Sequence, residues 1–184
     1  MKNNRGCEIS RIPYLWFRIS IQMKQIIFTA LLVLGIQWSN AQEKFNAYNP
    51  EADAKEDIQN AVAEAHSDNK HVLLQIGGNW CGWCKLFHEL TTTDEDLKAY
   101  IEQNFEVVHV NYSKENPNLE ILKQLEYPQR FGFPVFVILN AEGERIHTQS
   151  SGYLEEGKGH SKKLVLEFLQ AWSPGALNPE NYEN

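Results

Sequence analysis

Two cysteines three positions apart constrain this chain more than any other feature of its sequence. Cys81 and Cys84 follow the apolar run 72–76 and open a segment, 81–90, whose apolar residues recur at helical spacing. A helix N-terminus carries partial positive charge and unpaired N–H groups, so a thiolate there is stabilised and its pKa falls below the usual value of about 8.5. The pattern predicts a reactive thiol, Cys81, with Cys84 close enough to form a disulfide with it.

Other roles for such a pair need partners that the sequence does not place nearby. A structural zinc site usually takes four ligands. The chain offers one further cysteine, Cys7, in a segment that we expect to be removed, and His88 as an isolated candidate ligand. A c-type haem needs a histidine directly after the second cysteine, where Lys85 stands. A purely structural disulfide would close a loop too small to restrict the unfolded chain much. Redox exchange is favoured over these alternatives, and we expect no metal and no other cofactor.

The residues around the pair resemble the active site of the thioredoxin superfamily. Trp80 stands just before the first cysteine and Lys85 just after the second, in the motif Trp-Cys-Gly-Trp-Cys-Lys. Pro134 precedes the apolar run 135–139, as in that family, where a cis proline opens a strand facing the cysteines. The resemblance covers residues 72–172. It implies an α/β, thioredoxin-like fold with a central mixed β-sheet flanked by helices on both faces.

The resemblance also implies roles for individual residues. Cys81 would attack a substrate disulfide and Cys84 would resolve the mixed disulfide, while Gly82 and Lys85 would modulate the thiolate. Protein disulfides would be the substrates, and a membrane-bound or soluble redox partner would recharge the pair. The surface that contacts an extended substrate, in part by strand addition, would comprise Trp80, Trp83, Phe133 and Pro134.

One position departs from the family pattern. Many thioredoxins carry a buried Asp six residues before the first cysteine, thought to help deprotonate the resolving thiol, and Gln75 stands there instead. Glu89 or a bound water are the substitutes we consider, although Glu89 fits a surface position better. We expect His71 and His109 to be structural or exposed, as we do His88. The spacer lacks a histidine next to the second cysteine, which favours reductase or isomerase chemistry over strong oxidation.

The first part of the chain has the pattern of a targeting segment. An apolar run, 26–36, follows a short basic start and precedes the small residues 39–41. This is typical of a secretory signal peptide and is too short for a transmembrane span of about 20 residues. We expect residues 1–41 to be a leader and signal peptide cleaved after about Ala41, with Met23 as the true start. The protein would then act in the periplasm or otherwise outside the cytoplasm, with an uncleaved membrane anchor as the alternative.

The residues after the leader, 42–184, have the length of a single domain. Acidic residues outnumber basic ones by 24 to 17 in the full chain. This balance argues against binding to nucleic acid or to anionic lipid, and we expect a soluble mature form. After export and cleavage the chain would keep only two cysteines, in a compartment where disulfides persist. We therefore expect the pair to be a redox-active disulfide rather than a structural one.

Hydrophobic periodicity predicts the order helix, strand, helix, helix, strand, helix, strand, strand, helix. Asn49 and Asn116, each followed by proline, would begin helices, and Thr93 would cap another. A polar loop is expected over 152–159, and a polar tail that frays from about 173. The expected helices cover 50–67, 81–90, 93–103, 117–126 and 161–172, and the expected strands cover 71–76, 105–111, 133–139 and 145–150.

Two rival functions would use the same region. One is a binding or chaperone module that employs the groove near Pro134, and holding activity retained without the cysteines would favour it. The other is a carrier that binds a soft ion such as Cu(I) through the dithiol, which metal analysis of anaerobically purified protein would test. Both methionines, Met1 and Met23, lie outside the expected mature chain, so no methionine-rich flank supports the carrier.

Overall fold

The computed structural model describes residues 44–183. The expected leader, with its signal peptide and cleavage site, lies outside the described residues. The fold below is that of the compact unit that begins at Phe45. None of the helices described has the length and apolar character that a bilayer crossing requires.

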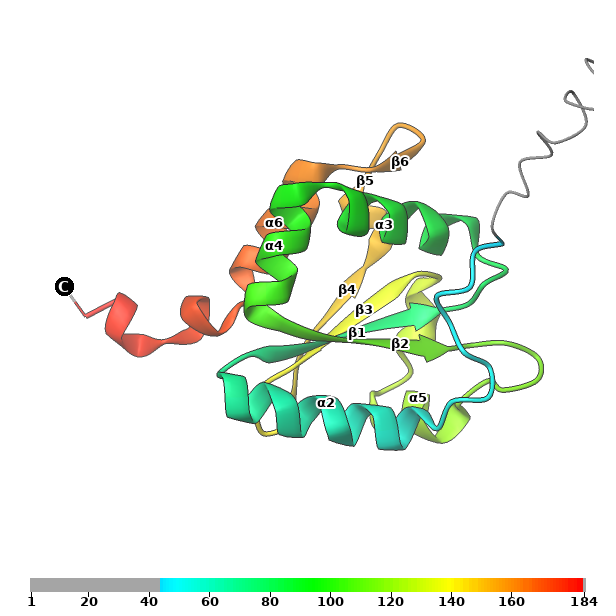
Figure 1. Ribbon diagram of the computed structural model, residues 1–184, viewed down its shortest axis with the longest axis horizontal. Helices are drawn as coiled ribbons and strands as arrows, with labels where there is room; N and C mark the ends of the chain where they lie inside the picture. Colours follow the sequence, from blue (N-terminus) through cyan, green and yellow to red (C-terminus); the bar gives the residue numbers. More distant parts are fainter. Residues whose placement is uncertain (1–43, 184) are drawn as a thin grey trace, which may run out of the picture. The chain divides into compact units, whose positions relative to one another are not determined.

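A four-stranded mixed sheet forms the centre of the fold, with strand order β2-β1-β3-β4 (Figure 1). β1 runs parallel to β2 and antiparallel to β3, and β4 runs antiparallel to β3. Every residue of β1 and β3 is buried, as expected for central strands covered on both faces. The strands are β1 (His71–Gly77), β2 (Phe105–Asn111), β3 (Val135–Leu139) and β4 (Arg145–Ser150), close to the predicted bounds.

Helices cover both faces of this sheet (Figure 1). Alternate residues of a strand point to opposite faces, so Leu74 packs with Ala61 of α2 while Leu73 packs with Phe87 of α3. This confirms the predicted α/β thioredoxin-like fold. One face carries α2 (Ala54–Asp68) and α5 (Leu119–Gln124), and the other carries α3 (Gly82–Thr93), α4 (Glu95–Asn104) and α6 (Lys162–Ala171).

The predicted start of the first helix is wrong by four residues. α2 begins after Asp53, whose carboxylate accepts the N–H groups of Lys55 at 2.9 Å and Glu56 at 3.2 Å. Asn49 instead accepts the N–H of Glu51 within a turn. Both Asn and Asp are good N-cap residues. Here Asp53, which directly precedes the buried Ala54, caps the helix instead of Asn49.

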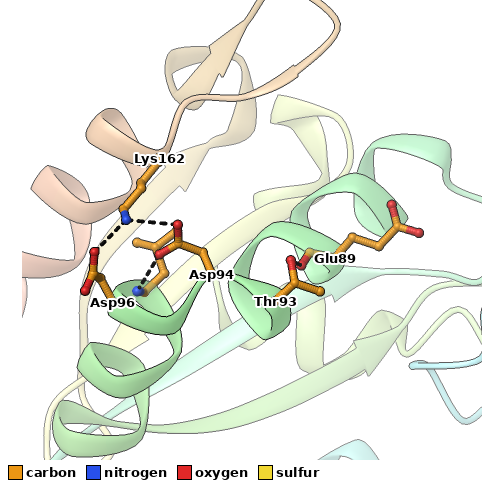
Figure 2. Close-up of polar contacts among 6 residues, drawn as sticks. Glu89, Thr93, Asp94, Asp96 and Lys162 are labelled. Carbon is orange, nitrogen blue, oxygen red and sulfur yellow. Dashed lines mark hydrogen bonds and ion pairs between the residues drawn. The ribbon is translucent and has the colours of Figure 1, made fainter.

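The predicted cap at Thr93 is also wrong, because α3 continues through that residue. The Thr93 hydroxyl donates to the carbonyl of Glu89 at 2.6 Å, within its own helix (Figure 2). Asp94 caps α4 by accepting the N–H of Leu97 at 3.1 Å, and it pairs with Lys162 of α6 at 2.9 Å. A carboxylate that satisfies both a helix terminus and a lysine therefore replaces the expected hydroxyl cap.

Two connections differ from their predicted form. α5 begins two residues later than expected, after Asn118, which has a left-handed backbone with φ of 48° and donates its side-chain amide to the carbonyl of Asn111 at 2.7 Å. The segment expected to be a plain loop contains a 3₁₀ turn and a small hairpin. These elements are the turn Ser151–Leu154 and the strands β5 (Glu155–Glu156) and β6 (Gly159–His160).

Candidate active site

The two cysteines lie where β1 delivers the chain to α3. The N–H of Cys81 donates to the carbonyl of Gly78 at 3.0 Å, which closes the turn before the helix. Cys81 is the N-cap of α3, and its Sγ accepts the N–H of Cys84 at 3.1 Å. The two residues form a disulfide, with Cα atoms 5.2 Å apart. The structure therefore places a sulfur at the helix N-terminus, where partial positive charge favours a thiolate.

The two cysteines differ in their access to solvent. Cys81 keeps 6% of its surface exposed and Cys84 keeps 1%, so Cys81 is the more accessible of the two residues. Gly82 is open, since a methyl group in place of its hydrogen would contact nothing within 4 Å. Lys85 forms an ion pair with Glu89 at 3.5 Å along the same helix, and both side chains are largely exposed.

Three aromatic side chains, Trp80, Tyr112 and Phe133, form an aromatic ridge beside the cysteine pair. Trp80 is 59% exposed, and its indole N–H donates to the carbonyl of Tyr112 at 2.7 Å. Phe133 contacts Trp80 edge-on at 5.5 Å between ring centroids and stacks on Tyr112 at 4.7 Å. Pro134 follows with a cis peptide bond. The structure thus brings three of the predicted surface residues together with Tyr112, which the sequence did not single out.

A pocket opens next to this ridge. It has a volume of about 570 Å³ and is lined by residues after the end of β2 as well as by the ridge itself. The exposed indole and the pocket together form a surface that an extended apolar segment could occupy. The lining residues are Trp80, Tyr112, Ser113, Lys114, Glu115 and Pro117.

Trp83 lies differently from Trp80. Its ring is half-buried and contacts His160 of β6 edge-on at 5.4 Å, rather than standing free in solvent as expected. The same histidine contacts Phe87 of α3 at 5.2 Å. The reason is the β5–β6 hairpin, whose packing against α3 the sequence did not predict. Burial lowers the pKa of His160, so this contact is made by a neutral imidazole at pH 7.

A segment before α2, residues 45–48, packs over the pair and was not foreseen. Tyr48 is 1% exposed and belongs to one buried cluster with Cys81 and Cys84. Asn79 holds the segment in place, because it accepts the N–H of Tyr48 at 3.0 Å and donates to the carbonyl of Tyr48 at 2.6 Å. The only sequence signal was a pair of aromatic residues, Phe45 and Tyr48, in a polar stretch.

The region beneath α3 contains imidazoles and an amide. Gln75, at the position where many thioredoxins carry Asp, is buried and pairs in register with His109 of β2. Burial, and to a lesser degree the charge of His88, lowers the pKa of His109 to about 4, so this ring is neutral at pH 7. Glu89 faces solvent and does not replace the missing acid.

The remaining sequence candidates have structural environments. His71 forms a hydrogen bond with the carbonyl of Trp172 at 2.8 Å, as expected for a structural residue. Across residues 44–183, the structure contains no group of three or more His, Cys, Asp or Glu side chains placed to hold a metal ion.

Comparison with known proteins gives one family match and several relatives. Residues 53–141, which include the cysteines and Pro134, match the family model described as thioredoxin-like. A solved structure of a disulphide isomerase from Xylella fastidiosa Temecula1 aligns with a TM-score of 0.62 at 27% identity, over 68% of this chain and 95% of that one.

Two curated relatives are named thiol:disulfide interchange protein DsbD. The protein from Vibrio cholerae is 28% identical over 102 residues, which is 54% of this chain and 16% of that relative. The protein from Campylobacter jejuni strain RM1221 is 32% identical over 83 residues, which is 45% of this chain and 14% of that relative. The matched part therefore spans a small fraction of either DsbD protein.

Proposed function

Because residues 53–141 form a domain of the thioredoxin-like family, we propose that this chain is a thiol–disulfide oxidoreductase that reduces or isomerises disulfides of other proteins. The observation that carries the proposal is the place of the Cys81 sulfur. It caps α3, accepts the N–H of Cys84 and is bonded to the Cys84 sulfur. The names of the relatives, disulphide isomerase and thiol:disulfide interchange protein, support the same class of reaction.

The cycle begins with the reduced pair. The Cys81 thiolate attacks one sulfur of a substrate disulfide, and the other substrate sulfur leaves as a thiolate that takes up a proton. Cys84 then loses its proton and attacks the Cys81 sulfur. The second substrate sulfur is released, and the pair is left as the disulfide that the structure contains. Two electrons have passed from the pair to the substrate, and a redox partner must return them.

Substrate binding is assigned to the aromatic ridge. Trp80 and Phe133 offer an apolar surface beside the attacking sulfur, and the pocket next to them can accept a side chain. The backbone around Pro134 precedes β3 and is the proposed place for strand addition by an extended segment. Trp83, within the spacer, contributes through a ring that is already packed on His160.

We also propose that the enzyme works outside the cytoplasm, as a single domain over residues 42–184 after removal of the leader. The pattern of residues 1–41, which is typical of a secretory signal peptide, supports this. A membrane-bound or soluble partner would keep the pair reduced.

Trapping tests this function directly. Cys84→Ser should accumulate a mixed disulfide between Cys81 and exported proteins, because the resolving sulfur is missing. Cys81→Ser should accumulate none and should fail to reduce insulin. The proposal is wrong if neither variant forms a mixed disulfide and the wild-type protein does not speed the reduction of insulin by dithiothreitol above the rate with dithiothreitol alone.

A further inference from the structure

The proposed cycle needs a group that stabilises the second sulfur. Cys84 must become a thiolate to resolve the mixed disulfide, yet it is almost completely buried. Burial disfavours a charged thiolate, and Gln75 offers no carboxylate to receive the proton. Glu89 points into solvent with Lys85 and is not available.

Tyr48 lies against this sulfur. A methyl group in place of the Gly77 hydrogen would lie 2.5 Å from Cys84 Sγ and 3.0 Å from the Tyr48 hydroxyl oxygen. Both atoms therefore border the small space beside Gly77, and their residues belong to one buried cluster. The ring is 1% exposed and contacts both cysteines in one cluster.

The side chain of Asn79 holds the backbone of Tyr48 in place. Asn79, two residues before Cys81, forms hydrogen bonds with both the N–H and the carbonyl of Tyr48. It also donates to the side chain of Asn46 at 3.0 Å. The turn that begins the active site thus fixes the segment that covers it, and the position of the hydroxyl is coupled to that of the cysteines.

The surroundings of Tyr48 favour a neutral donor. Two rings contact it edge-on, Phe45 at 6.1 Å and His109 at 5.2 Å between centroids. The titratable group that faces it beyond the cysteines is His109 of β2, whose ring in turn contacts that of His88 of α3 at 5.6 Å between centroids. Burial raises the pKa of the Tyr48 hydroxyl well above its usual value, so the proton stays on the oxygen at neutral pH.

We infer that the Tyr48 hydroxyl donates a hydrogen bond to the Cys84 sulfur in the reduced protein and in the mixed disulfide, and so stabilises the resolving thiolate. This inference rests on the proposed function. Tyr48 keeps its own proton throughout, and the proton that leaves Cys84 passes to solvent. In the disulfide state the same oxygen has a much weaker acceptor beside it. The hydroxyl therefore favours the reduced pair over the oxidised one.

The test removes only the oxygen. In a Cys81→Ser background, the thiol pKa of Cys84 is measured by NMR of its Cβ across a pH titration, with and without Tyr48→Phe. We expect Tyr48→Phe to raise this pKa by about one unit, because the thiolate form of Cys84 loses a hydrogen bond that the neutral thiol hardly uses. Tyr153→Phe removes a hydroxyl from an exposed ring and should leave the pKa unchanged.

A second readout uses the intact pair. Cys84 in Tyr48→Phe should release a preformed mixed disulfide about threefold more slowly than in the wild-type protein, because the loss of thiolate is partly offset by its greater nucleophilicity, while the attack rate of Cys81 changes little. Asn79→Ala, which keeps the hydroxyl but loosens its segment, should shift the Cys84 pKa in the same direction by less.

The outcomes separate this inference from the proposed function. An unchanged Cys84 pKa in Tyr48→Phe overturns the role of Tyr48, while insulin reduction by the wild-type protein leaves the function standing. If the wild-type protein reduces no disulfide, the function fails, and the pKa comparison still decides whether the hydroxyl bonds to the sulfur.

Discussion

Helices α3 and α4 begin with the same hydrogen bond made by different atoms. At α3 the Cys81 sulfur accepts the N–H of Cys84 at 3.1 Å, and at α4 the Asp94 carboxylate accepts the N–H of Leu97 at 3.1 Å. Both termini carry the partial positive charge of a helix start. The carboxylate is an anion that stays at its terminus, whereas in the proposed function the sulfur alternates between thiolate and disulfide. One local geometry thus serves structure in one place and reactivity in the other.

The neighbours of the two caps explain the difference. Lys162 of α6 pairs with Asp94 at 2.9 Å and with Asp96 at 2.6 Å, which ties α4 to α6 (Figure 2). The hydrogen bond from Lys162, followed by that from Leu97, lowers the pKa of Asp94. Cys81 has aromatic neighbours and a second sulfur instead of a lysine. The Asp94 cap stays an anion because Lys162 lies beside it. The Cys81 cap lies beside a second sulfur, with which it can form or break a disulfide bond.

The largest expected effect comes from exchanging the sulfur cap. Cys81→Ser and Cys81→Ala should both abolish disulfide exchange, because each removes the attacking atom. Their stabilities should differ under reducing conditions. The serine hydroxyl can cap α3, while alanine leaves the N–H of Cys84 without that partner and should cost about 1 kcal/mol more in urea unfolding. Equal stabilities of the two variants would show that the sulfur contributes nothing as a cap.

The second prediction is that the regions around α3 and α4 affect the stability of the protein over different pH ranges. The pKa of buried His109, beneath α3, is lowered from 6.5 to about 4, so the unfolded chain takes up a proton before the folded protein does. Stability should therefore fall as pH decreases from about 6.5 to about 4, by about 3 kcal/mol at most. The lowered pKa of Asp94 acts in another window, because its contribution is complete above the usual value of 3.8 and is lost only below it.

Urea unfolding at pH 7 and pH 5 of the wild-type protein and His109→Gln measures this difference. The variant should lose less stability between the two pH values than the wild-type protein does. A pH dependence that is identical in both proteins would contradict a neutral, buried imidazole beneath α3.

A smaller effect is expected at the carboxylate cap. Asp94→Ala should lower the melting temperature by a few degrees, because it removes the cap of α4 and one contact of Lys162. The alkylation rate of reduced Cys81 should not change. Asp96→Ala is the matched control, since it removes an ion pair of Lys162 but no cap. A slower Cys81 in Asp94→Ala would mean that the two helix starts are coupled.

The smallest expected effect concerns the first residue of each of the two helices. α3 has Gly82 there, while α4 has Glu95. Nothing lies within 4 Å of a methyl group placed on Gly82, so Gly82→Ala should stabilise the protein by about 0.5 kcal/mol through the unfolded chain. Differential urea unfolding measures it. A loss of stability would indicate that this backbone needs glycine.

The sequence predicted the central elements well because their signal is local. β3 is an unbroken apolar run, and β1 is one apart from Gln75 and its two end residues, and such runs have few alternatives to a buried strand. Helix starts were less predictable. Asn49 and Asp53, like Thr93 and Asp94, are neighbouring residues that can all cap, and tertiary partners such as Lys162 decided between the latter two.

Within the candidate site, the residues that belong to a local sequence motif were predicted, and those that reach it by long-range packing were not. The cysteines and Pro134 carry a recognisable motif, so their places followed from it. Tyr48 and His160 reach α3 only through long-range packing, and no local pattern indicates which distant ring will cover a helix. The sequence showed that Gln75 departs from the family pattern, but only the structure shows which groups stand around it.

The most direct test of this account is the thiol pKa of Cys81 in reduced Cys84→Ser protein, followed by the pH dependence of its alkylation with iodoacetamide. A sulfur that caps a helix should titrate well below the free-cysteine value of about 8.5 and should react readily near neutral pH. A pKa at or above that value would contradict the claim that the start of α3 makes this sulfur a nucleophile.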